Sequence, residues 1–380
     1  MIKIKSDKII NNGSLYSGYI YVDGEKIIGL SQTDTYDCQT YDFTGKYVSA
    51  GFIDLHTHGA GGFDFLTDDE NEVINGVNYL LQFGATSVLP TISTASYSRM
   101  DQAVKTIKKA KQSEKIKTNL IGAHLEGPYL SKSQCGAQNT SNLTVPIKKD
   151  YEKIIDDYGS AIARWTYAPE LDESGEFCDY IVRHGIVASA GHTDANYNQV
   201  RTAVAKGMNV ITHLYSATSS VTRKNGFRQI GVIESAFLID DLYVEIIADG
   251  KHLPTELINL IIKIKGVDKV ALVTDSLSIT DTDAKHGEMN GIEYIVEEGV
   301  CKLKDRTAFA GSVAKANDLI RTIIDCGLSV PLAVKMLTEV PAKILKLKKG
   351  KLEKGYDADI IIFDDQINVS NAFVLGEKIF

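Results

Sequence analysis

The chain has 380 residues, of which 44% are hydrophobic and 24% are charged, as in an ordinary globular protein. The formal net charge is -8, and the one dense cluster of basic residues, 346–354, is typical of a solvated turn. These values argue against a nucleic-acid partner. The five cysteines lack metal-ligand spacing, and neither a signal core nor a membrane-spanning apolar run is visible. We therefore expect a cytoplasmic protein with reduced thiols and no membrane partner.

The two ends of the chain share one pattern. Residues 1–49 read as extended runs without helical periodicity, and the tail contains two more extended runs, 360–363 and 369–380. Because the termini of a domain often lie close together, this pattern predicts one small β-sandwich domain built from residues 1–49 and 347–380. Residues 50–346 would form a second, larger domain inserted between the two ends.

The middle of the chain alternates between short apolar runs and amphipathic stretches. The apolar runs end in polar residues, and a glycine often follows a helical stretch. This alternation predicts an α/β fold with a parallel sheet, and about eight such units favour a closed (β/α)8 barrel of the TIM type. The predicted strands include 85–89, 119–125, 186–190, 209–212, 243–248 and 269–274, and the predicted helices include 72–83, 98–112, 147–157, 197–206, 255–265 and 317–326.

Polar residues recur where the predicted strands end. Five of the eight histidines, with two acids, fall at or just beyond such an end. In a barrel, that is the face on which active sites form. Each residue alone is typical of a polar strand cap, but caps do not explain the repetition at equivalent positions. The residues are His56, His58, Glu126, His192, His213, His252 and Asp275.

The sequence also predicts how individual histidines lie. His56 and His58 are two residues apart on an extended run, so both rings can point to one spot. His124 is two residues before Glu126, and we expect it one layer deeper, as a packing residue behind the ligands. His184 and His286 do not follow the pattern and would lie at the surface.

Several imidazoles and a carboxylate suit Zn2+, Fe2+, Co2+ or Mn2+. A mixed nitrogen and oxygen set is catalytic in type, because it leaves a position open for water or substrate. Asp275 can accept a proton from an attacking water, and His252 can donate a hydrogen bond to a carbonyl oxygen. The residues themselves predict hydrolysis of an unactivated amide or ester.

The motifs around these residues resemble the N-acetylglucosamine-6-phosphate deacetylases of the amidohydrolase superfamily. The resemblance runs in order from about residue 45 to the last residue, and this order is far more specific than a lone His-x-His pair. The motifs are Ala50-Gly-Phe-Ile-Asp-Leu-His-Thr-His, His124-Leu-Glu-Gly-Pro, Gly191-His-Thr-Asp-Ala, Thr212-His-Leu-Tyr, Ala248-Asp-Gly-Lys-His, Thr274-Asp and Ala310-Gly-Ser.

The resemblance implies a metal-bearing (β/α)8 barrel with a β-sandwich from both termini. The implied reaction removes acetate from N-acetylglucosamine 6-phosphate in amino-sugar catabolism. Glu126, His192 and His213 match the metal ligands common to the family. His56 and His58 match a pair that adds a second metal ion in some members, so the resemblance favours a binuclear site.

The resemblance also implies roles around the metal. Asp275 matches the catalytic acid and base, and His252 matches a residue that polarises the substrate carbonyl. Arg223 matches an arginine that reaches the sugar phosphate from a neighbouring subunit, which implies a homodimer. The positions that match substrate-contacting residues are Ala137, Gln138, Ser216, Ala217, His252, Phe309, Ala310 and Gly311.

Two departures from the family pattern lie where the phosphate would be held. The family's Asn-Ala-Met is Ser216-Ala-Thr here, and its Arg-Glu-Pro-Gly is Arg223-Lys-Asn-Gly. Lys224 and Arg228 can assist a phosphate contact made by Arg223. A related phosphosugar or an unphosphorylated amide therefore stays open as a substrate.

Two alternatives stand beside this interpretation. Another amidohydrolase, such as a dihydroorotase-like or aryl-amidase enzyme, would often use a carboxylated lysine as a bridging ligand, whereas Glu126 occupies that strand end here. A non-catalytic barrel scaffold would normally have lost ligands or the acid and base, and this chain retains them.

Overall fold

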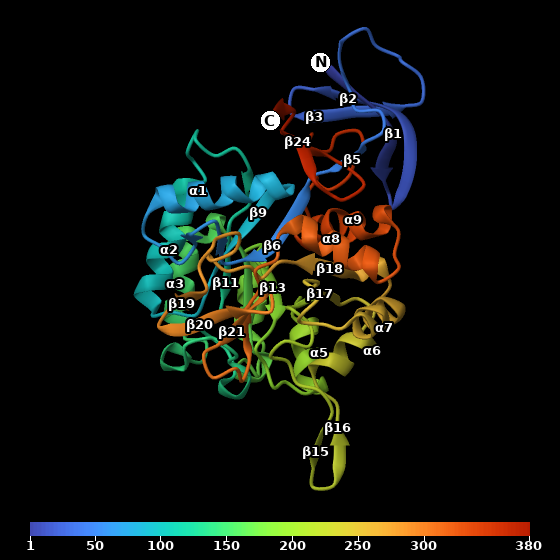
Figure 1. Cartoon of the computed structure of the whole chain (residues 1–380). Helices are drawn as coiled ribbons and strands as arrows, with labels where there is room; N and C mark the ends of the chain where they lie inside the picture. The colour runs from blue at the N-terminus through green and yellow to red at the C-terminus, as the bar shows by residue number, and fades with distance from the viewer.

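A closed ring of eight parallel strands forms the larger part of the molecule in the computed structural model, which describes residues 1–380 (Figure 1). A parallel bridge between Thr57 and Ser276 closes the ring, and the N–H of His58 donates to the Ser276 carbonyl at 2.8 Å. The short strand β10 (Asn119–Leu120) pairs with β9 just before β11. The ring strands are β6 (Phe52–Thr57), β9 (Ala85–Ile92), β11 (Ala123–Glu126), β12 (Ile162–Tyr167), β13 (Val187–Ala190), β14 (Val210–Ile211), β17 (Tyr243–Ile247) and β18 (Val270–Val273).

A helix follows each ring strand before the next one begins. The helices bury the apolar positions three and four residues apart that their sequences carry, as in α2, where Met100, Val104 and Ile107 are buried. Two further helices, α9 (Val330–Leu337) and α10 (Glu339–Ile344), complete the outer layer. The eight helices are α1 (Glu70–Leu80), α2 (Tyr97–Ala110), α3 (Lys148–Tyr158), α4 (Glu176–Arg183), α5 (Tyr197–Ala205), α6 (Val232–Leu238), α7 (Thr255–Lys265) and α8 (Ala316–Asp325).

Strands from both ends of the chain form a separate sheet, drawn above the barrel in Figure 1. The N-terminal and C-terminal parts join where β5 pairs antiparallel with β23. A core of 12 buried residues, including Ile4, Ile20 and Phe373, fills this part of the molecule. The strands are β1 (Ile2–Asn11), β2 (Ser14–Asp23), β3 (Lys26–Ser31), β4 (Gln39–Asp42), β5 (Tyr47–Ala50), β23 (Ile360–Phe363), β24 (Val369–Val374) and β25 (Glu377–Lys378).

The chain passes from one sheet to the other at Gly51. The apolar run 47–57 reads as continuous in sequence, but its first part, β5, belongs to the terminal sheet and its second part, β6, belongs to the barrel. A Cβ atom on Gly51 would lie 2.0 Å from the Oγ1 of Thr86, so the crossing needs a residue without a side chain. The chain thus leaves the terminal sheet and enters the barrel close to residue 49, where the sequence predicts the domain boundary. The boundary itself stays a prediction.

Three small sheets interrupt the alternation. A four-stranded insert between β18 and α8 lies over the carboxyl end of the barrel, and a hairpin between β14 and α6 projects away from it (Figure 1). No helix is both long enough and apolar enough to cross a membrane. The predicted barrel with an added β-rich domain is confirmed. The insert is β19 (His286–Met289), β20 (Ile292–Glu297), β21 (Val300–Leu303) and β22 (Phe309–Gly311); the hairpin is β15 (Thr222–Lys224) and β16 (Phe227–Gln229); the third sheet is β7 (Gly59–Ala60) and β8 (Phe63–Asp64).

Candidate metal centre and substrate pocket

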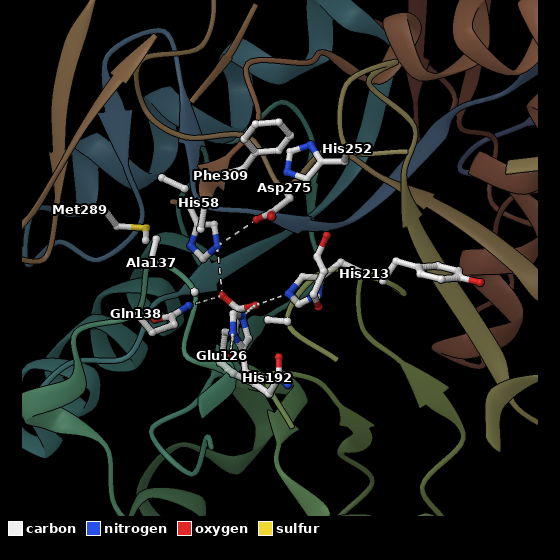
Figure 2. A pocket seen from close by; sticks show the side chains of 18 of the residues that line it. His58, Glu126, Ala137, Gln138, His192, His213, His252, Asp275, Met289 and Phe309 are labelled. Atoms are coloured by element: carbon white, nitrogen blue, oxygen red, sulfur yellow. Dashed lines mark hydrogen bonds and ion pairs between the residues drawn. The ribbon is translucent and has the colours of Figure 1, made fainter. Parts of the chain in front are cut away.

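A cavity of about 430 Å3 opens at the carboxyl ends of the barrel strands. This volume is in the range of small-molecule sites. Its lining combines polar residues from the strand ends with apolar residues from the insert (Figure 2). The lining residues are His58, Glu126, Ser133, Gln134, Gly136, Ala137, Gln138, His192, His213, Tyr215, Ser216, Ala217, His252, Asp275, Met289, Ala308, Phe309, Ala310 and Gly311.

Glu126 lies at the centre of the histidines that the sequence analysis singled out. Its Oε1 is 3.2 Å from the Nε2 of His192 and 3.1 Å from the Nε2 of His213. The same oxygen is 3.3 Å from the Nε2 of His56, and Oε2 is 3.2 Å from the Nε2 of His58. The structure thus brings all five expected ligands together, in two overlapping groups that share Glu126.

Strained backbone places three of the site residues. His192, His213 and Asp275 follow their strands with φ angles of 49°, 29° and 47°. Residues other than glycine rarely adopt this left-handed region, and such strain is concentrated at functional sites. The turns aim these side chains into the mouth of the barrel instead of along the outer wall.

The outer nitrogens of three histidines have oxygen partners. The Nδ1 of His58 lies 2.9 Å from the hydroxyl of Ser93. The Nδ1 of His192 lies 2.9 Å from the carbonyl oxygen of Gln134, and the Nδ1 of His213 lies 3.1 Å from the carbonyl oxygen of Ser216. A backbone carbonyl can only accept, so the proton of His192 and His213 lies on Nδ1 and the Nε2 lone pair faces Glu126. If both rings are neutral, these Nε2 lone pairs repel the Glu126 carboxylate, and a cation bound between them removes this repulsion. The donor set therefore fits a divalent metal ion.

Charges within the cluster shift its pKa values. Burial alone would raise the pKa of Glu126, but the adjacent His56, His192 and His213 outweigh burial and hold it well below its usual value. Burial would lower the pKa of His58, but Asp275 and Glu126 raise it to about 10. Each shift favours the charged form, as expected where opposite charges meet in a dry site.

Asp275 lies on the open side of this cluster. Its Oδ1 is 3.3 Å from the Nε2 of His56 and 3.3 Å from the Nε2 of His58. Across the cavity mouth, the Nδ1 of His252 is 2.8 Å from the Oδ2 of Asp249, and its ring contacts Phe309 edge to face at 4.9 Å between centroids. A carboxylate beside the cluster and an imidazole held over the cavity are the groups needed to move a proton and to polarise a carbonyl.

A buried polar layer supports the ligands from inside the barrel. Arg164 and Glu245 are fully buried and form a bidentate ion pair, with one contact of 2.8 Å. His124 is fully buried against Thr166, at 2.7 Å, and its ring contacts that of His56 edge to face. Burial, followed by the charge of Arg164, keeps the pKa of His124 well below its usual value. His124 thus packs behind the ligands, and His184 and His286 are exposed.

Most of the expected substrate positions line the cavity, but Arg223 does not. Arg223 lies in β15 of the projecting hairpin, where its side chain is exposed. Four residues of the site were not predicted from the sequence: Ser93 and Gln134, which contact two candidate ligands, and Tyr215 and Met289, which line the cavity. Gln134 lies within the run between the ligand motifs, but nothing in its own neighbourhood marks it. Met289 reaches the site only through the insert.

Comparisons with known proteins agree with this geometry. The model of the amidohydrolase family, whose members are metal-dependent, matches residues 47–379. N-acetylglucosamine-6-phosphate deacetylase of Caenorhabditis elegans is 31% identical over 98% of this chain and 93% of its own length. N-acetylgalactosamine-6-phosphate deacetylase of Shewanella sp. (strain ANA-3) is 29% identical over 98% of this chain and 94% of its own.

Solved structures give the same result. A mutant N-acetyl-D-glucosamine-6-phosphate deacetylase of Mycobacterium smegmatis, in complex with N-acetyl-D-glucosamine-6-phosphate, superposes with a TM-score of 0.91 at 25% identity, covering 99% of this chain and 98% of that one. The resemblance to these deacetylases that the motifs predict is confirmed. The chain therefore belongs to the amidohydrolase family.

Proposed function

We propose that this enzyme removes the acetyl group of N-acetylglucosamine 6-phosphate, giving glucosamine 6-phosphate and acetate. One observation carries the proposal: Asp275 lies beside a complete His and Glu cluster, at the mouth of a pocket of small-molecule size. Curated relatives that share nearly the whole length of the chain carry this activity in their names. The free cysteines and the small-molecule pocket suit a cytoplasmic enzyme of amino-sugar catabolism.

The metal would be Zn2+, Fe2+, Co2+ or Mn2+, held at one position by Glu126, His192 and His213. His56, His58 and the second oxygen of Glu126 would hold another ion, and the retention of both histidines supports two. A divalent ion supplies Lewis acidity, which polarises the amide carbonyl and makes a water molecule a stronger acid.

The residues of the chain would move the protons. Asp275 accepts a proton from the water that attacks the carbonyl carbon, and delivers it to the amide nitrogen. The C–N bond then breaks, the sugar leaves as an amine, and acetate remains. In its doubly protonated form, His252 would donate a hydrogen bond from Nε2 to the carbonyl oxygen, where negative charge develops, while its Nδ1 donates to the Oδ2 of Asp249, which fixes the ring.

The 6-phosphate needs a cation that this pocket does not supply. No lysine or arginine lines the cavity. Arg223 is directly opposite Arg228 in the antiparallel hairpin, so the two guanidinium groups share a face, and both are exposed. Like charges at facing positions repel each other, and an anion between them relieves the repulsion. We propose a homodimer in which Arg223 of one subunit reaches the substrate phosphate in the other, with Arg228 and Lys224 nearby.

A second substrate, N-acetylgalactosamine 6-phosphate, follows from the Shewanella relative, whose identity to this chain is similar. The two sugars differ in the configuration of one hydroxyl group, at carbon 4. Ser216, where this chain departs from the family pattern, lines the pocket.

A substrate panel tests the proposal. Metal-loaded protein would be assayed for acetate release from the 6-phosphates of N-acetylglucosamine and N-acetylgalactosamine, from unphosphorylated N-acetylglucosamine, and for turnover of dihydroorotate. We expect kcat/KM to be highest for N-acetylglucosamine 6-phosphate. Turnover of the cyclic amide alone would place the enzyme elsewhere in the family. Metal-loaded protein that hydrolyses no amide would support the scaffold alternative.

A further inference from the structure

One segment, residues 131–139, forms a wall of the pocket; we call it the pocket wall. It connects β11 to the helical turns before α3, and it is largely without regular structure. Part of it is buried, since Ala137 and Gln138 are 7% and 5% exposed. The pocket wall contributes Ser133, Gln134, Gly136, Ala137 and Gln138 to the cavity lining.

The pocket wall is bonded directly to two candidate metal ligands. The Nε2 of Gln138 donates to the Oε2 of Glu126 at 2.7 Å, which Figure 2 shows as a dashed line. The Nδ1 of His192 donates to the carbonyl of Gln134 at 2.9 Å. Loss of order in this segment would therefore remove a hydrogen bond from each of the two ligands.

The amide of Gln138 is occupied at both ends by the protein. Its Oε1 accepts from the N–H of Thr94 at 2.9 Å, while the Oγ1 of Thr94 donates to the backbone carbonyl of Glu126 at 3.0 Å. One donor of this amide and its oxygen are therefore engaged within the protein. That donor fixes the rotation of the Glu126 carboxylate, so that Oε1 faces His192 and His213.

Further bonds fix the first half of the pocket wall to the turn that carries His192. The N–H of Ser131 donates to the His192 carbonyl at 2.8 Å, and the Nε2 of Gln134 donates to the Oδ1 of Asp194 at 2.6 Å. The wall and the ligand turn therefore form one bonded unit.

These contacts imply a linkage between two events. To bind a metal ion, His192 must carry its proton on Nδ1, and the carboxylate of Glu126 must hold one orientation. The same tautomer and the same orientation make the hydrogen bonds to Gln134 and Gln138 of the pocket wall. If order in the pocket wall raises the affinity for a metal ion, then metal binding stabilises the ordered wall by the same free energy. We propose that Gln138 is a positioning residue that couples metal occupancy to the order of the pocket wall. This inference rests on the metal binding proposed above, but not on the identity of the substrate.

Hydrogen–deuterium exchange of the full-length chain tests the coupling without any substrate. Exchange of residues 131–139 would be measured by mass spectrometry in the metal-free protein and after saturation with Zn2+. The variants are Gln138→Met, which keeps the length of the side chain but has no amide, and Gln138→Ala. The matched control is Lys132→Ala, an exposed position in the same segment. Zn2+ affinity would be measured for each protein by calorimetry.

We expect Zn2+ to slow exchange in the pocket wall of the wild-type chain and of Lys132→Ala. In the Gln138 variants the wall should respond little to Zn2+, and the affinity should fall by about 10- to 100-fold, as for other groups that orient metal ligands. A merely structural role would instead raise exchange equally with and without the ion.

Three results would overturn the inference. The first is a wild-type chain in which bound Zn2+ does not change the exchange of the pocket wall. The second is a Gln138→Met variant with the same Zn2+ affinity and the same protection from exchange as the wild-type chain. A chain that binds no Zn2+ would overturn the metal proposal as well. If the acetyl sugar phosphate is not hydrolysed while the Zn2+-dependent protection is present, only the proposed substrate fails.

Discussion

The backbone N–H of Asp275 donates a hydrogen bond of 2.8 Å to the carbonyl of His56. Asp275 lies just beyond the end of β18, and His56 lies near the end of β6. These are the last and first strands of the ring, so this bond lies on the seam that closes the barrel. The candidate proton acceptor and a candidate metal ligand are therefore fixed to one another by main-chain atoms. Closing the barrel assembles the reaction centre.

Asp275→Asn tests the role of this carboxylate. The amide keeps the shape of the side chain and the seam bond, because that bond uses only the backbone. The kcat should fall by ~10^2- to 10^4-fold, as when a proton-transfer group is removed. Steady-state assays give the rate, and metal analysis of the same sample should show unchanged content. Near-normal turnover would mean that another group moves the proton.

His58→Ala tests the second metal position. We expect two ions per wild-type chain and one in this variant, because the group of Glu126, His192 and His213 stays complete. Glu126→Ala, which removes the ligand shared by both groups, should hold neither ion firmly. Elemental analysis after dialysis measures the content. Equal metal content in the wild-type protein and His58→Ala would show that the second position is not a metal site.

Arg223→Ala tests the phosphate contact. Hydrogen bonds to charged groups contribute about 1.5–3 kcal/mol, so kcat/KM for the phosphorylated substrate should fall by roughly 10- to 100-fold. Hydrolysis of unphosphorylated N-acetylglucosamine should change little. Arg201→Ala, which removes an exposed arginine on α5, is the matched control. An equal loss on both substrates would exclude a phosphate role.

Mixed dimers test whether Arg223 acts across subunits. Arg223→Ala and Asp275→Asn chains would be unfolded together, refolded and loaded with metal. In a mixed dimer, the subunit with an intact Asp275 receives an intact Arg223 from its neighbour. Activity on the phosphorylated substrate should then exceed that of either variant alone. Activity no higher than that of the separate variants would indicate an arginine that acts within its own chain.

Thiol labelling tests the packing around the pocket. Cys135 is partly exposed between two pocket-lining residues, whereas burial raises the pKa of Cys178 to about 11 and that of Cys301 to about 12. A raised pKa leaves little thiolate at pH 8, and the thiolate is the form that reacts. Iodoacetamide should label Cys38 and Cys135 first, and alkylation of Cys135 should slow turnover. Cys135→Ser should resist this inactivation, and early labelling of Cys301 would contradict the packing.

Local sequence pattern was sufficient to predict that the candidate ligands lie together at the strand ends. His56 and His58 are two residues apart, and this period carries both side chains to one face of a strand. His192, His213 and Asp275 were found because parallel strands of a barrel end on the same side, so position along each strand predicts position in space. This argument needs no knowledge of contacts between distant segments.

The groups that hold the ligands could not be found in this way. Gln138 bonds to Thr94, 44 residues away, and Met289 enters the pocket on an insert whose sequence resembles any exposed hairpin. Such contacts depend on how loops pack across the barrel mouth, which no periodicity records. The need for a glycine at position 51 could not be predicted for a similar reason, because Thr86, which would clash with a Cβ atom there, belongs to another strand.

Metal-dependent deacetylation is tested most directly by measuring acetate release while metal is titrated into the metal-free protein, with N-acetylglucosamine 6-phosphate as the substrate. We expect equal amounts of acetate and free amine, formed at a rate that rises with bound metal until the sites fill. Protein that binds metal through these residues yet releases no acetate from this sugar phosphate would contradict the proposed function.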